Sequence, residues 1–182
     1  MPIVINTYGD TRMTSKLKTD VLETVSGSGT IALTNQLSGM TSASMPSGSV
    51  VQVLIDEDSS SMLLASATYT DTDLSISITP SSTSSKILAL WNVQGNLSGQ
   101  NSGWGTRLVR DSTNVFTSNQ QYSQYSSGYV SQRHSADYKH IDSPNTTSTI
   151  TYKVQVSTYQ NSAVYFNDDT SQTQLVLMEI KG

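Results

Sequence analysis

The segment TYTDTDLSISITPSSTSSKILALWNVQGN, residues 68–96, joins two patterns of side chains that together indicate the fold. In its first half, Leu74, Ile76 and Ile78 alternate with polar residues, which is the pattern of a strand with one buried face. A cluster of Ser and Thr then indicates a turn. In the second half, residues 87–91 are apolar at every position, so the second strand has no polar face.

A strand that is apolar on both faces needs a cover on both faces. In a sandwich of two sheets, one face of each strand meets the core and the other normally meets solvent. The strands expected near 163–166 and 175–180 repeat the two-faced pattern of 87–91. We expect the second cover to be another subunit; a loop or arm of the same chain is the alternative. The side chains expected at this subunit interface are Leu88, Leu90, Val164, Phe166, Val176 and Met178.

The composition favours a folded all-β protein. The chain has 182 residues, enough for one domain with a core plus a small appendage. Charged residues make up 13% and hydrophobic residues 35%, while Ser and Thr supply about 30%. So little charge argues against intrinsic disorder, and hydroxyl residues with scattered β-branched ones suit strands and turns.

Charge and hydropathy exclude several classes of function. The net charge is −4 and no stretch concentrates Lys or Arg, so we expect no nucleic-acid partner. No apolar run approaches the roughly 20 residues of a membrane helix, so no membrane insertion is expected. The first ten residues lack a basic region followed by an apolar one, so no secretory signal is expected. The absence of Cys excludes disulfides and thiol chemistry.

The chain divides into two parts of different character. Residues 1–47 have few large side chains and several Gly and Ser, although the apolar spacing within 15–25 is compatible with a short helix. We expect this part to be an extended N-terminal arm that is ordered only by docking on a partner. Residues 48–182 are expected to form the folded domain.

Short strands separated by turn residues follow one another through the folded domain. No long helical period interrupts them, so we predict an antiparallel β-sandwich of eight to ten strands, most simply a jelly roll. The segments expected to be strands are 49–56, 61–70, 72–79, 85–93, 105–111, 114–118, 135–142, 148–159, 162–168 and 173–181.

Several phrases of the domain carry a resemblance to a known group of proteins. From about residue 40 onward the chain contains, in order, YTDTDLSISITPSSTSSKILAL, TRLVRDSTNVF, DSPNTTSTITYKVQV, AVYFND and QLVLMEIKG. Together they resemble the C-terminal domain of bacteriophage virion proteins, notably tail-fibre and appendage proteins of marine and cyanobacterial phages. The resemblance implies a homotrimeric jelly roll, similar to complement-type and tumour-necrosis-factor-like heads, with a non-enzymatic structural or attachment role.

The short N-terminal arm narrows the role that this resemblance implies. Long fibres of the group carry a lengthy shaft, whereas this chain has only about 47 residues before the domain. A short tail fibre or a capsid decoration protein fits better, located in the virion and assembled in the host cytoplasm. Its expected partners are copies of itself, other virion proteins that bind residues 1–47, and a host surface glycan or protein. The alternative is a monomeric carbohydrate-binding module of a cellular protein.

The sequence offers little catalytic chemistry. Its two histidines, His134 and His140, have no G-x-S-x-G elbow to support a Ser–His–Asp site, and only three Glu are present for glycoside hydrolysis. The acidic turns 56–58 and 168–169 lack the ligand spacing of a calcium loop. We therefore expect no catalytic residues, no cofactor and no metal; calcium at an acidic turn is the alternative to a solvated turn.

Two segments, 96–105 and 118–135, are predicted to be loops that carry recognition. The second has three tyrosines among Gln, Ser and Gly, and binding surfaces combine rigid aromatics with adaptable polar residues in this way. The alternative is that the tyrosines cover a sheet or line the seam between subunits. The residues predicted to contact a receptor are Trp104, Tyr122, Tyr125, Tyr129 and His134.

Overall fold

The computed structural model describes residues 44–182. The predicted arm, with the short helix considered within 15–25, lies outside the described residues except for residues 44–47. In the described part, no helix is long and apolar enough to cross a membrane.

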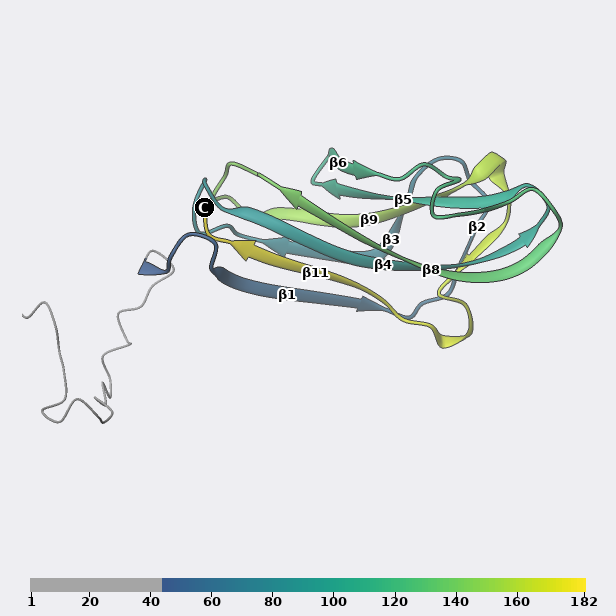
Figure 1. Cartoon of the computed structure of the whole chain (residues 1–182), viewed down its shortest axis with the longest axis horizontal. Coiled ribbons are helices and arrows are strands. Elements are labelled where there is room, and N and C mark those ends of the chain that lie inside the picture. Colours follow the sequence, from purple (N-terminus) through teal and green to yellow (C-terminus); the bar gives the residue numbers. More distant parts are fainter. Residues whose placement is uncertain (1–43) are drawn as a thin grey trace, which may run out of the picture. The chain divides into compact units, whose positions relative to one another are not determined.

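Eleven strands of the described part form two antiparallel sheets that pack face to face (Figure 1). The predicted all-β sandwich of two antiparallel sheets is therefore confirmed. Sheet A contains, in spatial order, β1 (Val50–Asp58), β11 (Thr173–Ile180), β4 (Lys86–Gly99), β10 (Val164–Phe166) and β2 (Met62–Leu64), with β8 (Val130–Asp142) also paired to β4. Sheet B contains β3 (Thr70–Ile78), β9 (Ile150–Thr158), β5 (Ser102–Arg110) and β6 (Thr113–Thr117), with β7 (Gln124–Ser126) also paired to β5. Two 3-10 turns, η3 (Tyr159–Asn161) and η4 (Asp168–Thr170), flank β10.

Strand β4 organises sheet A because three strands pair with it. Its first half pairs with β11 and its second half with β10, while β8 runs along its other side from Asp142 to Val130. A residue of β4 therefore has two cross-strand neighbours at most positions, which makes the register of the sheet easy to follow from this one strand.

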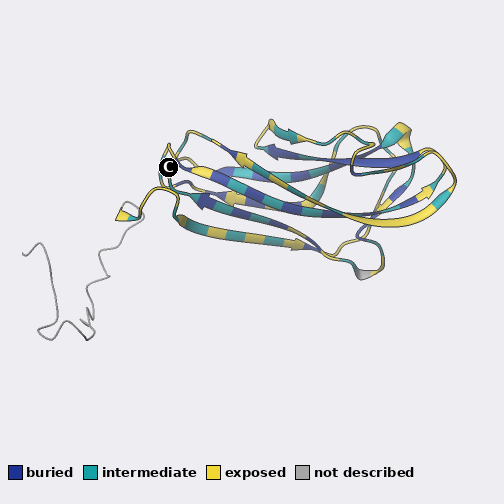
Figure 2. Ribbon diagram, in the orientation of Figure 1, coloured by how far each residue is buried: buried dark blue, intermediate teal, exposed yellow. Residues whose placement is uncertain are grey.

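The core lies between the two sheets, where the alternating apolar residues meet (Figure 2). Leu74, Ile76 and Ile78 of β3 are buried, as the alternation in the sequence predicts. In β4 the inward residues are the odd-numbered ones, such as Ile87 and Trp91, and each is almost fully buried. Strand β4 thus buries one of its two apolar faces in the core, and its other apolar face points away from the core.

One of the two segments that we predicted to be loops is largely strand, and the other is half strand. Strand β4 of sheet A continues to Gly99 and strand β5 of sheet B begins at Ser102, so within the segment 96–105 only residues 100–101 connect the two sheets. This tight connection uses positive φ at Gly99 (114°) and Asn101 (50°). Gly, Asn and Ser are poor strand formers, so these residues concealed the ends of the two strands in the sequence.

The predicted loop 118–135 contains β7 and the beginning of β8. Residues 131–135 of β8 are all exposed, because β8 is an edge strand of sheet A at this point. An edge strand with both faces in solvent shows no alternation of apolar and polar residues, which explains why the sequence indicated a loop.

The domain has two distinct ends. The chain enters beside its C-terminus, where the Gly48 backbone N–H donates to the Lys181 carbonyl (2.7 Å) and the Lys181 N–H donates to the Ser49 carbonyl (2.9 Å). The β4–β5 turn and the start of β8 lie at the opposite end (Figure 1). We call these the entry end and the far end.

Candidate functional site

The outer face of sheet A is the strongest candidate for a functional surface. The even-numbered residues of β4 point away from the core and are only partly buried within one chain. At the entry end they are Leu88 and Leu90, so the second apolar face of the sequence is real. This face is not covered by another part of residues 44–182.

The strand register extends this apolar character across four strands. Leu88 lies opposite Met178 on one side and Ile141 on the other, and Met178 in turn lies opposite Val53. The next row contains Ile55, Val176, Leu90 and Lys139 in the same order of strands. We define the apolar patch as Val53, Ile55, Leu88, Leu90, Ile141, Val176 and Met178.

Several members of the apolar patch are strongly exposed. The exposed fractions are 48% for Val53, 60% for Ile55 and 60% for Ile141. Scattered exposed apolar side chains are normal, but a contiguous group is typical of an interaction surface. The sequence had pointed to four of the seven members and missed these three. The spacing of two between Val53 and Ile55 was a signal, whereas Ile141 stands alone in a polar segment.

Two residues of the predicted subunit interface lie elsewhere. Val164 and Phe166 of β10 are 0% and 2% exposed and belong to the core, so their side chains face inward. Tyr165 between them faces outward instead. The prediction for Val164 and Phe166 is therefore wrong, because a three-residue strand that is apolar throughout does not reveal which of its faces is the inner one.

A shallow groove of about 640 Å³ lies over one side of the apolar patch. Leu90 and Val176 contribute its apolar lining. Asp137 and Lys139 of β8 lie on one side, and Gln174 of β11 lies on the other. An apolar floor with a polar rim suits an inserted side chain or strand of another protein.

The same face becomes polar toward the far end. After Leu90 the outward residues of β4 are Asn92, Gln94 and Asn96. At about 3.4 Å per residue, Asn96 lies about 27 Å from Leu88 along the strand. The outer face of sheet A is thus divided into an apolar half near the entry end and a polar half near the far end.

The predicted receptor residues do not form a single site. Trp104 is completely buried: its indole N–H donates to Gln124 Oε1 (3.0 Å) and its ring packs edge-on against Phe166 (5.6 Å between centroids). The prediction of Trp104 as a receptor contact is therefore wrong, because β5 turns this side chain into the core. Tyr122 and Tyr129 are each 84% exposed.

The other two predicted receptor residues are Tyr125 and His134. Tyr125 is held by contacts within the chain, and His134 lies on β8. The Tyr125 ring packs edge-on against Tyr159 (5.3 Å) and its hydroxyl donates to Asn101 Oδ1 (3.4 Å). His134 is exposed on β8, where it pairs with Gly95. Whether any of the four exposed residues contacts a receptor stays a prediction.

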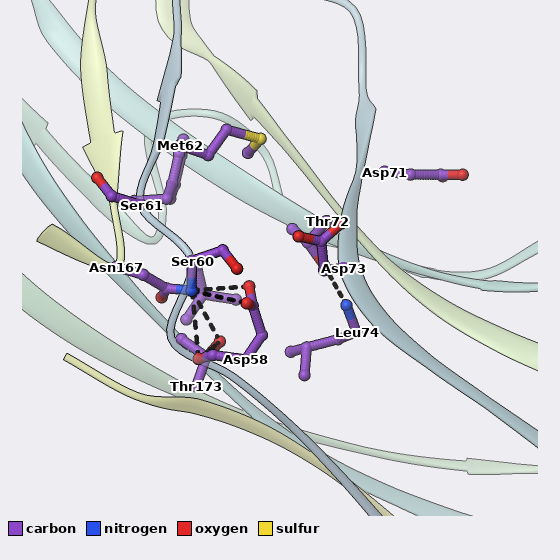
Figure 3. A pocket seen from close by; sticks show the side chains of 12 residues that line it. Asp58, Ser60, Ser61, Met62, Asp71, Thr72, Asp73, Leu74, Asn167 and Thr173 are labelled. Atoms are coloured by element: carbon purple, nitrogen blue, oxygen red, sulfur yellow. Dashed lines mark hydrogen bonds between the residues drawn. The ribbon is translucent and has the colours of Figure 1, made fainter. Parts of the chain in front are cut away.

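The predicted acidic turn 56–58 is the end of strand β1, and Asp58 is held by hydrogen bonds within the chain. One oxygen of the Asp58 carboxylate accepts from the Ser60 backbone N–H (2.8 Å) and the other accepts from Asn167 Nδ2 (2.9 Å). These residues and Thr173 line a pocket of about 220 Å³, with Asp71 pointing away from Asp58 (Figure 3). Within residues 44–182 no group of three or more His, Asp or Glu side chains is placed to hold a metal ion.

Comparisons with known proteins give no family. No protein-family model and no curated protein matches the chain. Two structures of infectious bursal disease virus match at 11% identity: the Gx strain (TM-score 0.41) and a mutant VP2 protein (0.42). They cover 73% and 74% of this chain but 37% of each viral chain. Dimeric latent PorU from Porphyromonas gingivalis matches at 9% identity and TM-score 0.33, covering 75% of this chain and 14% of that one. A likeness at this level assigns no function.

Proposed function

We propose that the protein is a non-enzymatic structural protein of a phage virion. It forms a homotrimeric appendage of the short tail-fibre or capsid-decoration type, docks on the particle through residues 1–47 and displays the β-sandwich as a head. The class of protein rests on the resemblance of residues 40–182 to phage tail-fibre and appendage domains.

The apolar patch is the observation that carries the proposal of self-assembly. Its rows run from β1 on one margin to β8 on the other. A contact that joins the β1 margin of one copy to the β8 margin of the next is head-to-tail, and such contacts form a closed ring when the rotation between copies closes. A second copy of the chain is therefore the occupant that we propose for the apolar surface.

The two ends of the domain suit a protein that is fixed at one end. The apolar half of the outer face lies near the entry end, where the proposed docking segment joins the domain. The polar half lies toward the far end, where the β4–β5 turn and the start of β8 are found (Figure 1). Assembly contacts near the particle and polar surface away from it are what an appendage requires.

The alternative is a carbohydrate-binding module of a cellular protein. The exposed Tyr122 and Tyr129 favour it, since aromatic side chains in solvent can stack on sugar rings. Such a module is expected to be monomeric. It would therefore leave the apolar patch exposed to solvent, without a subunit to cover it.

Electron microscopy of intact phage particles tests the proposal. A gold label on a tag at the C-terminus of this chain is expected on the tail or the capsid surface, in groups of three. Particles that assemble without the labelled protein, or label confined to host cells, would contradict the virion role.

A further inference from the structure

The polar half of sheet A carries an arrangement of side chains that the proposed assembly does not use. One row of outward residues there contains Leu63, Tyr165, Asn96 and Arg133, on four neighbouring strands. Directly opposed residues of neighbouring strands have Cβ atoms about 5 Å apart, so the Tyr165 ring, the Asn96 amide and the Arg133 guanidinium lie side by side. Tyr165 is 38% exposed, so part of its ring is open to a ligand.

A pocket of about 350 Å³ opens beside this row, at the small end of the range for ligand sites. Hydrogen bonds and ion pairs hold its lining in place. Asn96 Nδ2 donates to Asp168 Oδ2 (2.8 Å), while Arg133 Nη2 lies 3.3 Å from the same oxygen and also contacts Asp169. Amide, guanidinium and carboxylate groups thus already contact one another before any ligand arrives.

The turn that carries the two carboxylates is itself anchored to the core. Asn167 precedes them with φ of 53°, and its side chain donates to Asp58. The hydrogen bond from Asn96 lowers the pKa of Asp168, so this carboxylate is ionised at neutral pH.

Two oxygens in the lining lack hydrogen-bond partners. Asn96 Oδ1 and Ser171 Oγ are each shielded from solvent and make no hydrogen bond within residues 44–182. Buried polar atoms are usually paired, and exceptions are frequent at functional sites. Both oxygens are hydrogen-bond acceptors, which suits a ligand with several hydroxyl donors.

We propose that this pocket binds a neutral sugar unit whose hydroxyls contact Asn96, Arg133 and Asp168 and whose ring extends over Tyr165, which lies beside the pocket rather than in its lining. The aromatic ring supplies an apolar platform, and the planar polar groups beside it accept and donate hydrogen bonds in fixed directions. This inference deepens the proposed function by naming the receptor as a glycan and moving its site from the tyrosine segment to sheet A.

The charges of the pocket select against an acidic sugar. Two carboxylates surround one guanidinium, so Arg133 is already neutralised and the local charge is about −1. A sialic or uronic acid would meet repulsion rather than a free cation. A divalent cation is disfavoured for a related reason, because Arg133 already occupies the carboxylate oxygens.

The test is saturation-transfer NMR on the full-length chain with lactose, maltotriose, N-acetylglucosamine trimer and mannotriose, and with sialyllactose as the acidic probe. At least one neutral probe is expected to bind with a dissociation constant in the millimolar range, and sialyllactose should bind at least about tenfold more weakly than lactose. Tyr165→Ala and Asp168→Asn should each weaken binding about tenfold. Asp73→Asn, at an exposed carboxylate on β3, is the matched control and should change nothing.

Three outcomes would overturn the glycan site. They are binding by none of the neutral probes, tighter binding of sialyllactose, and unchanged binding in Tyr165→Ala with loss on mutating Tyr122 and Tyr129. Circular dichroism of each variant verifies that the fold is retained. Leu90→Asp separates this inference from the proposed assembly, since it should leave the affinity for a soluble sugar intact whether or not the chain is trimeric.

Discussion

Glu179 shows how a single buried residue joins the two sheets. Its side chain is completely buried and has no cationic partner within residues 44–182. The carboxylate accepts from the Ser81 N–H (2.7 Å), the Ser81 hydroxyl (2.6 Å) and Gln52 Nε2 (2.6 Å). Gln52 also donates to the Thr79 carbonyl beyond the end of β3 (3.0 Å), so this cluster ties β1 and β11 of sheet A to the edge of sheet B.

These contacts make stability depend on pH in a defined direction. Burial acts to raise the pKa of Glu179, but the hydrogen bonds from Ser81 and Gln52 outweigh it, and the pKa lies below its ordinary value of 4.5. A carboxylate whose pKa is lowered by folding stabilises the protein above its unfolded pKa. That stabilisation is lost as the pH falls through the lower, folded pKa.

Glu179→Gln is therefore expected to lower the free energy of unfolding by about 1–3 kcal/mol at pH 7, because one donor is left facing another donor. The difference from the original protein should shrink in acid, below the folded pKa. Urea unfolding between pH 7 and pH 3 measures both effects. Asp73→Asn, at an exposed carboxylate of β3, should cost less than about 0.5 kcal/mol. Equal effects of the two substitutions would contradict the role of Glu179.

Gly95 gives a second prediction at the scale of one residue. A Cβ atom at this position would overlap the indole of Trp104, which is fully buried. Gly95→Ala should therefore destabilise the domain by about 1–3 kcal/mol, as overpacking does in other cores. Gly128→Ala is the control, since a Cβ there meets nothing within 4 Å. The midpoint of urea unfolding measures the difference in stability between the two variants. Equal midpoints would mean that the side chains around Gly95 rearrange to accept a Cβ atom without loss of stability.

At the scale of the element, alternation in the sequence predicted the inner strands better than the edges. Strands β3 and β9 have one neighbouring sheet and one solvent face, so their period of two is clear. Strand β8 has an exposed edge and polar residues on both faces, and the connected ends of β4 and β5 contain several small residues. Neither pattern distinguishes a strand from a loop. The start of β8 is held by its pairing with β4, since its residues 131–135 are exposed.

The pattern of apolar and polar residues also predicted the candidate surfaces only in part. Residues 87–91 predicted an outer apolar face because a strand of five apolar residues must have two apolar sides. No such logic shows which face of residues 163–166 is the inner one, or that Asn96, Arg133 and Asp168 meet. Their proximity depends on a register between strands that are distant in the sequence.

Leu90→Asp tests the apolar patch as an element of assembly. Leu90 is in the second row of the patch, and an aspartate there would place an unpaired charge in a subunit contact at a cost of several kcal/mol. The variant is expected to remain folded but to run as a monomer in size-exclusion chromatography with light scattering. Ser77→Asp, on the outer face of sheet B, should keep the oligomeric state of the original chain. A trimeric Leu90→Asp variant would exclude the patch as the interface.

At the scale of the whole molecule, assembly and docking are expected to reside in different parts of the chain. A chain that begins at residue 41 retains every strand of both sheets and the complete apolar patch. We expect it to fold and to form trimers but to be missing from purified particles, as measured by mass spectrometry of virions. Normal incorporation of the truncated chain would mean that docking does not depend on residues 1–40.

Sedimentation equilibrium of the full-length chain tests the central claim of self-assembly through the outer face of sheet A most directly. The claim predicts a species of about 59 kDa, three times the 19.7 kDa of one chain, across a wide range of protein concentrations. A soluble species of 19.7 kDa that does not associate on concentration would contradict it.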